Sequence, residues 1–167
     1  DILIRFCEQM PYGFVVIWCL KNVGVTPVQF GLLTTIEMVT AMLVYIPVAL
    51  LVERYRTKKV FIAITFGFFS LFPVLLLFSK SMMVLAVAFW VRGLKEFGEP
   101  TRKSLILDFA KGPNQGALFG VYYLLRDVVV AGAVLVGGML WAISPAANLL
   151  TATAFGVLGT IYFILFC

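Results

Sequence analysis

The sequence contains no histidine and only three cysteines, Cys7, Cys19 and Cys167. It also has no Gly-x-Ser-x-Gly segment, no glycine-rich phosphate loop and no cysteine cluster with metal-ligand spacing, so nothing in it supports hydrolytic or redox chemistry. An enzyme is therefore the least expected class, and we expect neither a cofactor nor a metal ion. Cys7 and Cys19 would lie about 18 Å apart on one helix, too far to pair, and we interpret all three cysteines as small apolar fillers.

Charged residues are also scarce. They make up 13% of the chain, and hydrophobic residues make up 62%. A soluble domain has about 25% charged and about 45–50% apolar residues. The mean hydropathy of the chain is +1.06. Several segments approach the roughly 20 apolar residues that cross a bilayer as a helix. The sequence thus predicts an integral membrane protein with the lipid bilayer as a partner, and its net charge of +5 reflects topology and not nucleic acid binding.

A secretory signal is not expected either. The first apolar segment carries Arg5 and Glu8 and is followed by no small-residue cleavage site. Because the chain opens on Asp1 inside an apolar segment, we expect a fragment of a longer protein.

The apolar segments predict one all-α bundle of six transmembrane helices, over residues of about 2–20, 30–52, 60–78, 82–103, 117–142 and 147–167. Pro11 and Gly13 predict a kink in the first helix. Basic residues gather in residues 53–59 and 102–111, which makes these two loops cytoplasmic by the positive-inside rule. Six spans then place both termini in the cytoplasm.

Charge is distributed over these spans with a period of three. The first and fourth spans carry several charges, the second and fifth fewer, and the third and sixth none. This order indicates a 3+3 inverted repeat, with charged helices facing a central cavity and charge-free helices, including the Phe-rich span 60–78, facing lipid. With only six helices to compare, coincidence is the alternative.

Three segments resemble motifs of the major facilitator superfamily. Residues 49–59 are similar to a degenerate Gly-x-Leu-x-Asp-Arg-x-Gly-Arg-Lys loop signature, with Glu53 in the Asp position and the second glycine lost. Arg92 is similar to the arginine of the family's Arg-x-x-x-Gly motif, although residue 96 is glutamate. Residues 100–127 resemble the passage from the fourth to the fifth helix of many bacterial members.

The resemblance covers the whole chain and implies half of a twelve-helix carrier. The degenerate loop signature favours the C-terminal half over the N-terminal half. Implied partners are a second six-helix half, in the same polypeptide or in another chain, and a small-molecule substrate. The implied location is the bacterial cytoplasmic, or inner, membrane.

Candidate functional residues are concentrated in residues 92–103, where six of twelve residues are charged. Arg92 would lie near mid-depth, where an unpaired charge costs at least about 2.5 kcal/mol, so it requires a partner or water. We expect i, i+4 ion pairs from Arg92 to Glu96 and from Lys95 to Glu99. Arg92, Lys95 and Glu96 are candidates for a substrate or ion pathway.

Further candidates for this pathway come from other helices. Asp127 is expected to pair with Arg92 or Lys95, and its neighbour Arg126 to reach a different helix, because adjacent helical residues point about 100° apart. Glu8 and Glu37 are intramembrane carboxylates that could carry a proton. The alternative for each is a structural ion pair.

A cytoplasmic gate is the second predicted site, formed by Glu53, Arg54, Glu99 and Arg102. Topological charge, lipid headgroup contact and snorkelling are the alternatives. Gly132, Gly137 and Gly138 are expected to permit close helix packing.

The leading functional hypothesis is half of a secondary active transporter that moves a small anionic or zwitterionic solute by alternating access, coupled to protons. The alternative is a non-transporting integral membrane subunit that uses the same fold as a scaffold or assembly element in a larger membrane complex.

Overall fold

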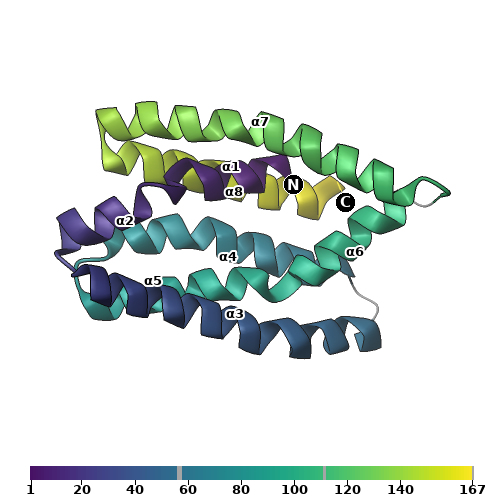
Figure 1. Cartoon of the computed structure of the whole chain (residues 1–167), viewed down its shortest axis with the longest axis horizontal. Coiled ribbons are helices and arrows are strands. Elements are labelled where there is room, and N and C mark those ends of the chain that lie inside the picture. The colour runs from purple at the N-terminus through teal and green to yellow at the C-terminus, as the bar shows by residue number, and fades with distance from the viewer. Residues whose placement is uncertain (56–57, 111, 167) are drawn as a thin grey trace.

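The computed structural model describes residues 1–55, 58–110 and 112–166, with the backbone alone for residues 53–55. Every regular element of this part of the chain is a helix, which confirms the all-α prediction (Figure 1). The elements are α1 (Ile2–Tyr12), α2 (Val15–Trp18), the π-helical turn η1 (Cys19–Val23), α3 (Pro27–Tyr55), α4 (Lys58–Phe78), α5 (Met82–Leu94), the 3₁₀ turn η2 (Lys95–Gly98), α6 (Glu99–Phe109), α7 (Gln115–Ile143) and α8 (Pro145–Phe166).

Four helices of the described residues, α3, α4, α7 and α8, are long and apolar enough to cross a membrane, and a fifth span results if α1 and Val15–Val23 are counted together. The protein is therefore an integral, multi-pass membrane protein. The expected span 82–103 is divided into α5, η2 and α6. With 13 residues, α5 reaches only about 20 Å, short of the roughly 30 Å hydrocarbon layer, so six spans remain a prediction.

The expected kink in the first helix is confirmed. α1 ends at Tyr12, directly after Pro11, and the chain bends by 44° before Val15–Val23. Proline lacks an amide hydrogen and its ring displaces the preceding turn, which breaks the helical hydrogen-bond ladder. The amide of Phe14 then bonds to Pro11, so the carbonyl of Met10 is left for another donor.

Asn148 of α8 supplies that donor. Its side-chain amide donates to the carbonyl of Met10 at 3.2 Å and to the carbonyl of Gly137 at 2.7 Å, and the residue is fully buried. One side chain thereby ties α1, α7 and α8 together. Gly137 permits this approach because a Cβ there would collide with the backbone of Met10, whereas no atom lies within 4 Å of a Cβ at Gly132. Close packing is thus confirmed for Gly137 and wrong for Gly132, and Gly138 has only an ordinary contact with Phe14.

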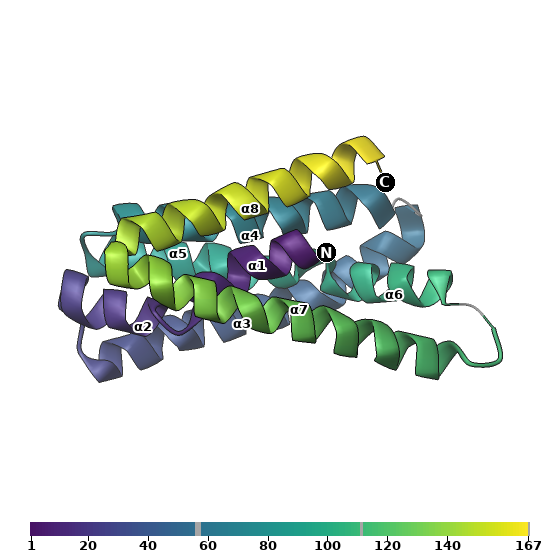
Figure 2. The ribbon, with the colours of Figure 1, turned by 90° about the horizontal axis from the view of Figure 1, so that it is seen from above.

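The helices form two groups in Figure 1: α1, α7 and α8 on one side, and α3, α4 and α5 on the other. Seen from above in Figure 2, α8 lies over α4, against which it packs. α4 joins the groups, since it packs against α8, α5 and α1. The prediction that the charge-free span 60–78 faces lipid is wrong. Half of its apolar window is buried, against 11–22% for the other three long helices. Its buried aromatic residues are Phe61, Phe66, Phe69 and Phe72.

Replacing the bridging amide tests this description of the fold. We expect Asn148→Ala to lower the free energy of unfolding by about 1–3 kcal/mol, because the buried carbonyl of Met10 loses its hydrogen bond. Thermal unfolding in detergent measures the change. Thr153→Ala is the matched control, since that hydroxyl bonds only within α8 and its loss is expected to have a small effect. Equal melting temperatures for the two variants would contradict the bridge.

Candidate functional site

An open cavity of about 700 Å³ lies between α1, α2, α3 and the α5–η2 segment. Its size falls within the range of about 300–1,000 Å³ typical of small-molecule sites. Charged, polar and apolar side chains share its wall: Arg5, Glu8, Gln9, Tyr12, Gly13, Val15, Val16, Phe30, Thr34, Glu37, Met38, Arg92 and Lys95.

Lys95 is the centre of the ion pairs in this wall. Its Nζ lies 2.8 Å from Glu8 of α1 and 3.7 Å from Glu37 of α3. Glu8 also accepts from Arg5 at 2.6 Å, and Glu37 pairs with Arg92 at 3.2 Å. Four of the predicted pathway residues are therefore brought together, and each carboxylate faces two cations.

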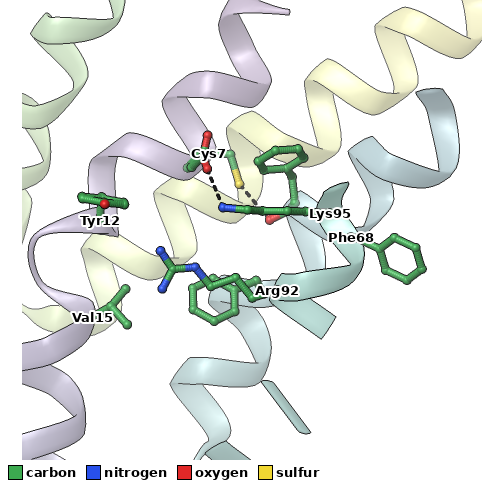
Figure 3. Close-up of a pocket in the computed structure, with 9 residues that line it drawn as sticks. Cys7, Tyr12, Val15, Phe68, Arg92 and Lys95 are labelled. Atoms are coloured by element: carbon green, nitrogen blue, oxygen red, sulfur yellow. Dashed lines mark hydrogen bonds and ion pairs between the residues drawn. The ribbon is translucent and has the colours of Figure 1, made fainter. Parts of the chain in front are cut away.

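Aromatic rings surround the Arg92 guanidinium. Its central carbon lies 4.9 Å from the ring centroid of Phe72 and 5.7 Å from those of Tyr12 and Phe89. Rings at this distance attract a cation through their negative faces. Arg92, Lys95, Tyr12 and Phe72 also line a smaller pocket of about 20 Å³ that adjoins the cavity (Figure 3).

The expected i, i+4 pairs from Arg92 to Glu96 and from Lys95 to Glu99 are wrong. The α-helix ends at Leu94, and the 3₁₀ turn η2 winds the chain more tightly, so residues beyond Lys95 leave the expected helical face. Arg92 and Lys95 turn towards α3 and α1 instead. Glu96 lines a neighbouring pocket on α3, and Arg92 pairs with Glu37 in its place.

A second ion cluster lies beside the first. Glu99 accepts two hydrogen bonds from Arg102, at 2.9 and 2.8 Å, and one from Arg5 at 3.0 Å. Asp1 accepts from Arg102 at 2.7 Å and from Tyr122 at 2.6 Å. The cluster joins α1, α6 and α7, and Arg5 belongs to both clusters.

The expected pair between Asp127 and Arg92 or Lys95 is wrong. The Asp127 side chain is 62% exposed and bonds to the adjacent Arg126, at 2.6 and 2.8 Å. We expected these neighbours to diverge, but the long arginine side chain curls back along the helix and reaches the carboxylate. Arg126 is buried, with Tyr123 stacked 4.1 Å from its central carbon and Asp1 at 3.6 Å. Neither residue lines the cavity.

The structure describes the side chains of two of the four predicted gate residues. The side chains of Glu53 and Arg54 lie outside the described residues. Glu99 and Arg102 are buried and bond to each other. A gate at these four residues stays a prediction.

Sequence reasoning missed Arg5 and Asp1 as members of the ion clusters. The signal for them was present, because Asp1, Arg5 and Glu8 recur at helical spacing and so share one face. It also missed Phe72, for which no sequence signal exists, because an aromatic residue in an apolar helix has no distinguishing neighbour.

Removing the central cation tests the ion cluster. We expect Lys95→Gln to cost about 3 kcal/mol of stability, because it leaves Glu8 and Glu37 short of a partner. The double variant Lys95→Gln with Glu8→Gln is expected to recover part of this loss, since Arg5 retains Glu99. Chemical unfolding in detergent measures both. Lys58→Gln, in a half-exposed pair with Asp108, is the control and is expected to cost less than about 1 kcal/mol. If the double variant lost as much stability as Lys95→Gln and Glu8→Gln lose separately in sum, the two residues would not be coupled and the ion cluster would be refuted.

Comparison with known proteins identifies the family. A family model described as Major Facilitator Superfamily matches residues 2–167, which is nearly the whole chain. No curated protein matches the sequence. The family model, the apolar helices and the resemblance of the loop segments agree, and members of this family are transporters and not enzymes. The chain belongs to the Major Facilitator Superfamily.

Proposed function

We propose that the chain is one six-helix half of a secondary active transporter and that a small anionic or zwitterionic solute binds in the cavity between α1, α3 and α5. One observation carries the proposal: three cationic and two carboxylate side chains line an open cavity of about 700 Å³, whereas the charges of the second ion cluster are buried and bonded to one another. Intramembrane charges facing a cavity are typical of a substrate or ion path.

The arrangement of helices supports six spans in a 3+3 inverted repeat. In such a repeat α1, α3 and α4 are equivalent to α5, α7 and α8, in that order. The contact of α1 with α8 then corresponds to that of α5 with α4. The contact of α1 with α7 likewise corresponds to that of α5 with α3, and all four contacts occur. The first and fourth spans are both broken, by the 44° bend after α1 and by η2 after α5. Discontinuous helices at equivalent positions form the binding sites of many transporters.

Alternating access requires a second bundle, and we propose another six-helix half on the open side of the cavity, in the same polypeptide or in another chain. The degenerate signature at residues 49–59 favours the C-terminal half for this chain. α3, α6 and α8 end towards the same end of the bundle (Figure 1), which supports a cytoplasmic face for both basic segments. The proposed location is a bacterial inner membrane with both termini in the cytoplasm.

Glu37 is the carboxylate that we propose exchanges protons. Its ion pairs with Arg92 and Lys95 are 3.2 and 3.7 Å long, whereas Glu8 is held by hydrogen bonds of 2.6 and 2.8 Å. Protonation of Glu37 would therefore disturb fewer close contacts. It would also leave Arg92 and Lys95 with one fewer negative charge between them, which favours entry of an anion.

The alternative is a non-transporting subunit that uses the same fold as a scaffold. A scaffold has no need of an open polar cavity, since a dry and fully paired interface stabilises a bundle better. The tightly bonded cluster around Glu99 fits either function. The cavity around Lys95 favours the carrier.

Solute-dependent proton movement tests this proposal. The full-length protein is reconstituted in liposomes that contain a pH-sensitive dye, and mono- and dicarboxylates and amino acids are added under an inward proton gradient. We expect at least one solute to accelerate acidification. Glu37→Gln is expected to abolish this proton movement and to retain exchange of labelled solute between the two sides, because exchange needs no net proton transfer.

Asp127→Asn is the matched control, since Asp127 is exposed and lies outside the cavity, and it is expected to behave as the wild type. Solute uptake at a rate independent of the pH gradient would contradict the proposed proton coupling but not the proposed transport. Failure of every solute to move by uptake or exchange would remove the transport proposal.

A further inference from the structure

Arg92 differs from Arg5 and Arg102 in how its guanidinium is used. Both terminal nitrogens of Arg5 bond to carboxylates, at 2.6 and 3.0 Å, and both terminal nitrogens of Arg102 do so at 2.7 and 2.8 Å. Arg92 has one ion pair, from Nε to Glu37 at 3.2 Å. Among the described residues, none accepts a hydrogen bond from its two terminal nitrogens.

These free nitrogens face the cavity. Arg92 lines both the large cavity and the adjoining small pocket, and its side chain extends towards Tyr12 and Val15 on the opposite wall (Figure 3). The rings of Phe72, Phe89 and Tyr12 hold the guanidinium in place but cannot accept its in-plane hydrogen bonds. The planar fork of an arginine matches the two oxygens of a carboxylate. The geometry thus leaves a preorganised donor pair without an acceptor.

The charge of the cavity limits the ligand. Three cations and two carboxylates line it, which gives one net positive charge. A singly charged carboxylate balances this charge, whereas a phosphate ester, close to two negative charges at neutral pH, exceeds it. Lys95 is already held between Glu8 and Glu37, and both terminal nitrogens of Arg5 have acceptors although its buried Nε has none. Among these three cations, Arg92 is therefore the one whose terminal nitrogens both lack an acceptor.

The rest of the wall indicates the remainder of the ligand. Phe30, Val15, Val16 and Met38 are apolar, and Gln9 and Thr34 add neutral hydrogen-bonding groups. We infer that Arg92 is the substrate-recognition residue, that it binds the carboxylate of the solute through its terminal nitrogens, and that the solute is a small monocarboxylate with an apolar body. This inference rests on the proposed transport function, because it assigns the substrate class of the same cavity.

A matched series of compounds tests the assignment without any variant. Binding of benzoate, benzamide and benzylammonium, and of hexanoate, hexanamide and hexylammonium, is measured by calorimetry on the full-length protein in detergent. Each set keeps its apolar body and changes only the charge of its head group. We expect at least one carboxylate to bind about tenfold or more tighter than its amide and its ammonium counterpart, the ratio that one charge-assisted hydrogen bond supplies.

Substitution then assigns the effect to the fork. Arg92→Lys keeps the charge and loses the paired donors, so it is expected to weaken carboxylate binding about tenfold or more. Arg126→Lys is the matched control, because Arg126 lies outside the cavity, and it is expected to leave that affinity unchanged. Melting temperatures of the ligand-free variants verify folding.

Three outcomes would overturn the inference: equal affinity for carboxylate and amide, no binding by any of the six compounds, or unchanged carboxylate affinity in a folded Arg92→Lys variant. The last is expected if a carboxylate of the second half occupies the fork instead. Failure of the transport proposal has a different signature, since carboxylates would then bind in an Arg92-dependent way without uptake into liposomes. Uptake of a cationic or neutral solute without carboxylate binding would preserve transport and refute the assignment.

Discussion

The structure depends on one constraint, the cost of placing charge inside an apolar helical bundle. Every arginine and lysine in the described interior forms an ion pair with a carboxylate, from another helix or from a neighbouring turn, which reduces this cost. Lys95 lies between Glu8 and Glu37, and Arg102 between Glu99 and Asp1. Three of these four pairs, from Lys95 to Glu8 and Glu37 and from Arg102 to Asp1, link elements that lie far apart in the sequence, so they help to fix how α1 sits against α6 and the α5–η2 segment. The charges therefore organise the packing of helices whose apolar surfaces could pack in many ways.

The same constraint explains how much of the site could be predicted. Glu8, Glu37, Arg92 and Lys95 were identified from sequence because a charge inside an apolar run is conspicuous and requires a partner. Their pairing could not be identified, since it depends on two close approaches of the backbone, of Gly93 in α5 to α3 and of Gly98 in η2 to α4. A Cβ on Gly93 would lie 2.6 Å from the backbone oxygen of Glu37, and a Cβ on Gly98 would lie 2.6 Å from that of Phe61. Between these two contacts the α-helix ends at Leu94, and Lys95 pairs with Glu8 of α1. No local pattern distinguishes such a glycine from one that faces lipid.

In the fold, too, features set by local sequence were predicted and features set by tertiary contacts were not. The helices, the membrane class and the kink at Pro11 follow from local composition and backbone chemistry, and all were predicted. The environment of α4 was not, because lipid and protein interior are equally apolar and a charge-free helix suits both. Phe69 and Phe72 illustrate the consequence. They were expected to face lipid, yet Phe69 packs over Arg5 and Lys95, and Phe72 over Arg92, so the apolar helix supplies the aromatic wall of the charged site.

The two ion clusters differ in a way that bears on mechanism. Around Glu99 the contacts are hydrogen bonds of 3.0 Å or less, and both Glu99 and Arg102 are almost completely buried. Around Glu37 the ion pairs are longer, and the cavity lies beside them. A solute that competes for Arg92 or Lys95 has less to displace at Glu37 than at Glu99. Arg5 bonds to both Glu8 and Glu99, so any change in the charge at Glu8 alters the electrostatic environment of the tighter cluster. One bundle thus combines a cluster of short hydrogen bonds that links α1 to α6 with a cluster in which the ion pairs of Glu37 are longer, and Arg5 is the physical link between them.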